Sequence, residues 1–144
     1  MNTNQEKIKN LLSNLENANH YEKQPATKEQ IETFIEIATE KQVPQNVIAQ
    51  LVELYEVTDG YNYEIVMAFH SCTDEIIFEW WDDDEELWLG QRDFYTLRWS
   101  DGKFCLGDAS DVSFDEEYEA ETLIGLIEIC IKDIEEADYF GEDD

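Results

Sequence analysis

The spacing of apolar residues changes twice along this chain and divides it into helical and extended parts. Up to Gly60 the apolar residues recur every three or four positions, as on one face of a helix. From Tyr61 to Leu106 they alternate or form short runs, and from Leu123 the helical spacing returns. The sequence therefore predicts an α+β fold, with an antiparallel sheet of about four to six strands flanked by N-terminal helices and one long C-terminal helix.

Three helices are predicted in the N-terminal part. The first covers residues 5–19 and is expected to be an amphipathic helix on a short arm. The second begins after Pro25-Ala26-Thr27, because Thr27 and Gln30 have the spacing of a capping box. Its expected buried residues are Ile31, Phe34, Ile35 and Ala38.

The third helix opens at Pro44 and ends at Thr58-Asp59-Gly60, where glycine can take the left-handed conformation found at helix C-termini. Its expected apolar face is Val47, Ile48, Leu51, Leu54 and Tyr55. Three short strands are predicted after it, at Glu64–His70, Glu75–Trp81 and Leu87–Leu89. The first two carry apolar residues on both faces, as expected of strands that are covered by helices.

The strongest local prediction is a hairpin with Asp101-Gly102 at its tip, because a type I′ turn needs positive φ at both central residues. A two-residue loop fixes the register, so that Trp99 faces Phe104 and Leu97 faces Leu106. This register places Tyr95, Leu97 and Trp99 on one face and leaves Thr96 and Arg98 on the other.

The C-terminal part is predicted to contain a turn or helix start at residues 115–121 and then one long helix. The apolar stripe of this helix is Leu123, Leu126, Ile127, Cys130, Ile131 and Ile134. We expect residues 1–144 to form a single domain, with a helical arm at 1–24, a core at 25–138 and an acidic tail at 139–144.

Composition favours a cytoplasmic protein that does not enter a membrane. No run approaches the roughly 18 apolar residues of a membrane span, and the start, MNTNQEKIKNLL, lacks the apolar region of a secretory signal. Cys72, Cys105 and Cys130 are odd in number and flanked by apolar residues. They are therefore expected to be buried thiols in a reducing compartment.

The net charge of −27 is the strongest compositional signal. Residues 42–91 contain twelve acids and no base, and residues 107–144 contain fifteen acids and only Lys132. Such a surface repels nucleic acid and anionic membranes. The excess is interpreted either as a solubilising surface or as a docking face for a basic protein.

Catalytic and metal-binding patterns are absent from the sequence. His20 and His70 have no Cys/His cluster around them that would complete a zinc site, and no phosphate-binding loop or nucleophile elbow is present. Weak binding of a divalent cation by the run Asp82–Glu86 is an open alternative. We expect no enzymatic activity, no cofactor and no structural metal.

The candidate partner-binding site is Trp80, Trp81, Asp82, Asp83, Asp84, Glu85 and Glu86. Aromatic anchors surrounded by charged residues are typical of protein interfaces. The alternatives are that the acidic run is a solvated loop, and that strand alternation buries one tryptophan and half-covers the other.

Several motifs, taken in order, resemble the SUKH superfamily of Smi/Knr-like domains over about residues 25–135. They are ATKEQIETF from Ala26, Val43-Pro44 opening a helix that ends in Asp59-Gly60, Leu89-Gly90 after a tryptophan, and the Tyr95–Leu106 hairpin followed by Gly107-Asp108. The resemblance implies an α+β domain that binds proteins without catalysis. Many bacterial members are immunity proteins that neutralise toxins, often nucleases, while fungal relatives regulate glucan synthesis.

The resemblance and the charge together predict an immunity-type inhibitor of a basic toxin, such as a nuclease. The alternative is a regulatory scaffold of the glucan-synthesis-regulator type that binds a cellular protein.

Overall fold

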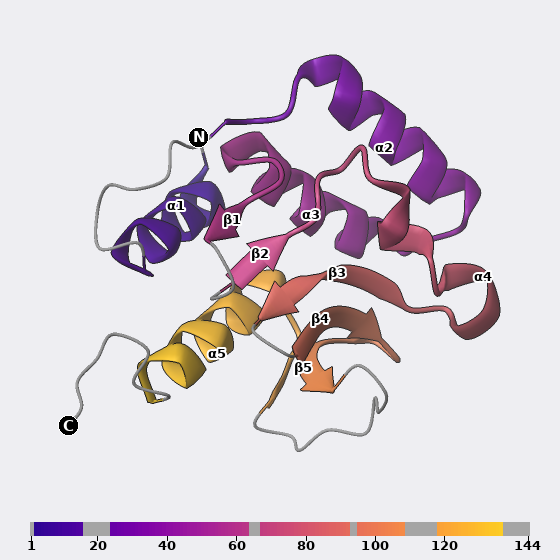
Figure 1. Cartoon of the computed structure of the whole chain (residues 1–144). Helices are drawn as coiled ribbons and strands as arrows, with labels where there is room; N and C mark the ends of the chain where they lie inside the picture. Colours follow the sequence, from indigo (N-terminus) through magenta and orange to yellow (C-terminus); the bar gives the residue numbers. More distant parts are fainter. Residues whose placement is uncertain (1, 16–23, 64–66, 93–94, 109–117, 137–144) are drawn as a thin grey trace.

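The elements follow the predicted order of helices, strands and a final helix. The computed structural model describes residues 2–15, 24–63, 67–92, 95–108 and 118–136. In chain order these residues form α1 Thr3–Leu15, α2 Lys28–Glu40, α3 Gln45–Val57, β1 Asn62–Tyr63, β2 Met67–Phe69, the 3-10 helix η1 Glu75–Phe78, α4 Trp81–Asp84, β3 Leu87–Arg92, β4 Tyr95–Ser100, β5 Lys103–Asp108, β6 Glu119–Ala120 and α5 Leu123–Glu136. The predicted α+β class is confirmed (Figure 1).

The sheet is an antiparallel meander in which every strand pairs with its neighbours in the sequence, in the order β1 to β6. The predicted hairpin register is confirmed, with Leu97 opposite Leu106 and Trp99 opposite Phe104. Asp101 and Gly102 both have positive φ, at 53° and 82°. The turn chemistry thus sets the register of the longest strand pair.

Local signals also set the start of α2. The Gln30 backbone N–H donates to Thr27 Oγ1 at 3.1 Å, and the Thr27 N–H donates to Gln30 Oε1 at 2.9 Å, so the predicted capping box is present. Ile31, Phe34 and Ala38 are buried, but Ile35 is 36% exposed. The prediction for Ile35 was wrong because only one side of α2 is covered by the rest of the molecule (Figure 1).

The other helices bury their predicted apolar faces. All five residues expected on α3 are buried, and Gly60 is left-handed with φ +66°, two positions after the Thr58 cap. The first helix, predicted on a short arm, packs Ile8 and Leu12 into the core beside α3 and α5. In α5, five of the six predicted residues are buried, and Ile131 is half-buried.

Helix α5 covers the sheet face that carries Leu97, Phe104 and Leu106. On this face Arg92 is 2% exposed, and its Nη2 lies 2.8 Å from Asp133 Oδ2 on α5. The opposite face carries Thr96, Arg98 and Cys105, as strand alternation requires.

The predicted strand at Glu75–Trp81 was wrong, because this segment forms η1 and then α4. The Asp74 carboxylate accepts the Ile76 N–H at 3.1 Å, which satisfies an amide of the first turn and favours a helical start. Ile77 is buried and Phe78 stacks on Phe34 of α2. Consecutive apolar residues therefore find partners around a tight turn, without the alternation of a strand.

Two further boundaries differ from the predictions. Within the predicted turn or helix start at residues 115–121, Glu119–Ala120 is a strand that pairs with β5. Strand β3 continues beyond Gly90 to Arg92, with a bulge at Leu89. A Cβ at Gly90 would lie 2.0 Å from the Ala68 carbonyl oxygen, so only glycine lets β2 approach this closely.

Several predictions fall outside the described residues. They concern His20, the end of the first predicted helix at residues 16–19, the rest of the arm up to residue 23, the first part of the Glu64–His70 strand, residues 115–117, and the acidic tail at 139–144.

Candidate functional site

The two adjacent tryptophans after η1 send their side chains to opposite faces of the sheet. Trp81 contacts Trp99, and Trp80 contacts Trp88 and Arg98. Trp99 and Arg98 are neighbours on β4, so their side chains stand on opposite faces. The segment η1 packs along β3 (Figure 1). Trp80 thus stacks on Trp88 of β3, while Trp81 contacts Trp99 of β4.

Trp81 fastens α4 to the end of α2. Its side chain is 8% exposed, and its Nε1 donates to the Lys41 carbonyl at 2.8 Å. This bond satisfies a carbonyl at the C-terminus of α2, which has no partner within the helix. The position of α4 is therefore tied to α2 by a buried aromatic side chain.

Trp80 forms the centre of an aromatic and cationic stack. Its ring lies parallel to that of Trp88 at 4.4 Å, and the Arg98 guanidinium lies 4.4 Å from its centroid. His70 meets Trp88 edge-on at 5.4 Å. Burial lowers the pKa of the His70 imidazole, although the nearby Asp74 carboxylate opposes this shift.

Glu86 belongs to the interior, unlike the other acids of the candidate site. It is 7% exposed, and its Oε1 accepts from Arg98 Nη1 at 2.7 Å while its Oε2 accepts from Ser100 Oγ at 3.0 Å. The Arg98 Nε donates to Thr96 Oγ1 at 2.9 Å. Glu86 is therefore a structural partner of Arg98, and we remove it from the candidate docking residues.

The remaining acids, Asp82–Glu85, form an exposed surface that we call the acidic turn. Asp82, Asp83 and Asp84 lie in the single turn of α4, and Glu85 ends it in the left-handed conformation, with φ 57°. Asp82 Oδ1 lies 3.6 Å from Lys41 Nζ, a solvent-exposed pair of small energetic value. The acidic turn thus presents most of its negative charge to solvent.

A hollow of about 340 Å³ lies beside the acidic turn, and we call it the tryptophan groove. Its lining residues are Lys41, Gln42, Pro44, Trp81, Asp82, Glu85 and Trp99. It combines aromatic carbon with two carboxylates, which suits a cationic side chain of a partner.

A second hollow of about 610 Å³ lies between α2 and the segment that leads into η1, and we call it the α2 groove. Its lining residues are Glu29, Gln30, Thr33, Ile37, Lys41, Cys72, Thr73, Asp74, Glu75 and Phe78. Lys41 borders both grooves. The sequence did not reveal this groove, because it depends on how η1 packs against α2.

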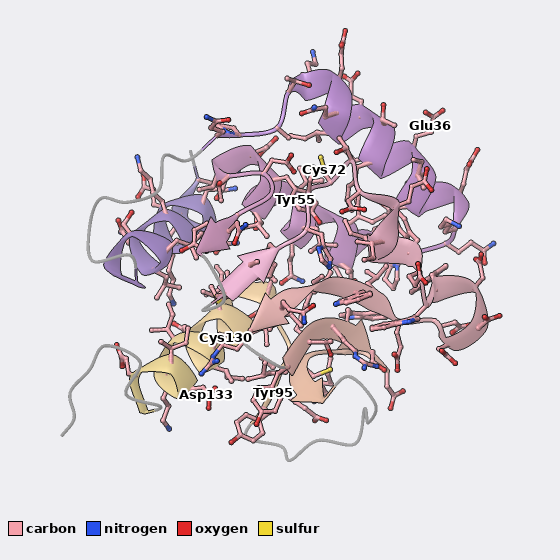
Figure 2. All side chains as sticks on the ribbon, viewed as in Figure 1. Glu36, Tyr55, Cys72, Tyr95, Cys130 and Asp133 are labelled. Atoms are coloured by element: carbon pink, nitrogen blue, oxygen red, sulfur yellow. The ribbon has the colours of Figure 1, made fainter. Side chains whose placement is uncertain are left out.

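The cysteines are free thiols that are ill suited to nucleophilic chemistry. Cys72, Cys105 and Cys130 are buried, and burial is the main cause that raises the pKa of each thiol to about 12. Figure 2 places Cys72 beside Tyr55 and Cys130 on α5, far apart in the fold. A thiol with such a pKa is almost entirely protonated at neutral pH.

Within the described ranges, no group of three or more histidine, cysteine or carboxylate side chains is arranged to hold a metal ion. In the same part of the chain, none of the helices has the length and apolar character needed to cross a membrane.

Comparison with known proteins gives no relative: no family model, curated protein or solved structure matches this chain. The resemblance to the SUKH superfamily stays a prediction.

Proposed function

We propose that this protein is a non-catalytic binding module that docks a basic protein through the acidic turn. The observation that carries the proposal is the exposure of Asp82–Glu85 beside a groove lined by Trp81 and Trp99. Exposed charges steer the encounter of two proteins, and a groove of aromatic carbon can hold a desolvated anchor. The acidic turn and the groove together offer both.

The partner that this surface fits is a basic toxin domain, and the protein would act as an immunity-type inhibitor. A nuclease must be basic where it binds nucleic acid, so an acidic inhibitor can compete for that surface. The net charge of −27 and the resemblance to SUKH immunity proteins support this proposal.

The distribution of the few cations adds support. Arg92 and Arg98, the two arginines of the sequence, are both buried against carboxylates. They therefore do little to neutralise the outer surface, and residues 42–91 contain no lysine or arginine. The acidic turn lies in this tract.

Co-expression tests the proposal. A gene adjacent to that of this protein is expressed alone and together with it, and we expect the neighbour to be toxic alone and harmless in the pair. Protection should weaken with Asp82, Asp83 and Asp84 changed to Asn. Protection should persist in a control with Glu6, Glu121 and Glu135 changed to Gln. This control removes the same number of charges, one from α1, one just before α5 and one within α5.

Equal protection by both triple variants would contradict docking through the acidic turn. If no toxin gene lies beside the gene of this protein, and the protein binds a cellular protein, the regulatory scaffold would be favoured. Hydrolysis of a substrate from a test panel, abolished by one carboxylate substitution, would contradict the non-catalytic assignment.

A further inference from the structure

The α2 groove has an apolar interior between two walls of different origin. On α2, Glu29, Thr33, Ile37 and Lys41 follow one another at four-residue spacing and form one wall. Ile37 is 38% exposed and presents aliphatic surface to the groove. Phe78 contributes apolar surface from the other side and is held by stacking on Phe34, with ring centroids 6.2 Å apart.

The second wall is held by hydrogen bonds within the protein. The Asp59 carboxylate accepts from Ser71 Oγ at 2.7 Å and from the Cys72 N–H at 2.8 Å. Asp74 in turn accepts the Ile76 N–H, which fixes the start of η1. This wall is therefore already formed before a ligand binds, and binding would cost little ordering entropy.

The rim of the groove is acidic, and at one end of the groove a lysine of the protein itself lies over an aromatic ring. Glu29, Asp74 and Glu75 are exposed along it. At one end Lys41 Nζ lies 5.6 Å from the centroid of the Phe78 ring. An apolar interior with an acidic rim is complementary to an apolar side chain flanked by cations.

We propose that the α2 groove binds a short basic segment of the partner, with one or two apolar side chains seated against Ile37 and Phe78. Lysine or arginine residues on either side of them face Glu29, Asp74 and Glu75. This inference rests on the proposed function, since it gives the same basic partner a second contact. Because Lys41 borders both grooves, the second contact adjoins the acidic turn.

Two matched peptides separate the apolar contact from the charge. The probes are the amidated hexapeptides Lys-Lys-Leu-Phe-Lys-Lys and Lys-Lys-Ser-Ser-Lys-Lys, titrated by fluorescence anisotropy at physiological ionic strength. Both carry the same charge, so the ratio of their affinities reports the apolar contact alone. For the wild-type protein we expect the Leu-Phe peptide to bind about tenfold more tightly.

The chain supplies a matched control for the protein variants. Ile35 and Ile37 lie on the same helix at nearly equal exposure, 36% and 38%, but only Ile37 lines the α2 groove. Ile37→Ser should reduce the affinity ratio to near one, and Ile35→Ser should keep it. Equal ratios in the two variants, or a ratio near one in the wild type, would overturn the proposal.

The same peptides distinguish this inference from the proposed function. Changing Asp82, Asp83 and Asp84 to Asn should leave the affinity ratio unchanged, because none of them lines the α2 groove. If this variant loses the ratio, the peptide binds at the acidic turn and the groove proposal is overturned. Loss of the ratio in Ile37→Ser alone supports the groove, whatever the outcome of co-expression.

Discussion

At the scale of single residues, Gly102 determines the tip of the β4–β5 hairpin. Its φ is +82°, and an added Cβ would meet no atom within 4 Å, so the cost of a side chain comes from the backbone angle alone. Gly102→Val should lower the free energy of unfolding by about 1 kcal/mol or more, since β-branched residues resist positive φ. Gly102→Asn should cost less, because asparagine tolerates this region.

Urea denaturation of the three proteins measures this difference. Equal midpoints for wild type and Gly102→Val would contradict the turn assignment.

His70 should make stability depend on pH. Burial lowers the pKa of its imidazole in the folded state, whereas the unfolded chain has a histidine pKa of about 6.5. As the pH falls below that value, the unfolded chain binds the proton first and the folded state loses stability. Between pH 7.5 and 5.5 the wild type should therefore lose more stability than His70→Gln, measured by thermal unfolding. Parallel pH profiles would refute the proton linkage.

At the scale of elements, the Glu86–Arg98 pair connects the start of β3 with β4. Both side chains are buried, so Arg98→Met leaves a carboxylate in the interior without its cation. We expect a loss of about 3 kcal/mol or more. Adding Glu86→Gln to this variant should restore part of the loss, because the charge is then removed.

Chemical denaturation of the single and double variants gives the test, with Lys103→Met as a control of a more exposed cation on the neighbouring strand. If Arg98→Met costs no more than Lys103→Met, the pair is not a structural link.

Elements with strong local signals could be predicted from the sequence, and those that depend on tertiary contacts could not. The capping box of α2 and the Asp101-Gly102 turn follow from short-range rules and were found. The run Ile76-Ile77-Phe78 fits a strand as well as a helical turn, because consecutive apolar residues carry no clear period. Only the hydrogen bond of Asp74 and the packing of Phe78 on Phe34 decide between them.

In the candidate site, too, some features follow from the sequence and others depend on tertiary contacts. Exposure of Asp82–Glu85 follows from their charge, since an unpaired carboxylate is too costly to bury. Burial of Glu86 requires Arg98, and the hairpin register had already placed Arg98 opposite the apolar set. The pairing of β3 with β4 shifts by one residue at the bulge at Leu89, and this shift brings Leu87 opposite Trp99 and Glu86 beside Arg98. No short-range rule marks the bulge in the sequence, so the burial of Glu86 could not be predicted from the hairpin register.

At the scale of the whole molecule, the net charge is −27, and both arginines are buried in pairs with carboxylates. The tract at residues 42–91 supplies both the acidic turn and one wall of the α2 groove, and it contains no lysine or arginine. We therefore expect the association rate with a basic partner to fall as ionic strength rises, because screening weakens steering.

The most direct measurement of docking through the acidic turn is association kinetics at two ionic strengths. The partner is the protein identified by co-expression or pull-down, immobilised on a sensor surface. At low salt, changing Asp82, Asp83 and Asp84 to Asn should slow association by about tenfold and flatten its salt dependence. The control with Glu6, Glu121 and Glu135 changed to Gln should keep nearly the wild-type rate. If the two variants associate equally fast, the acidic turn is not the docking site.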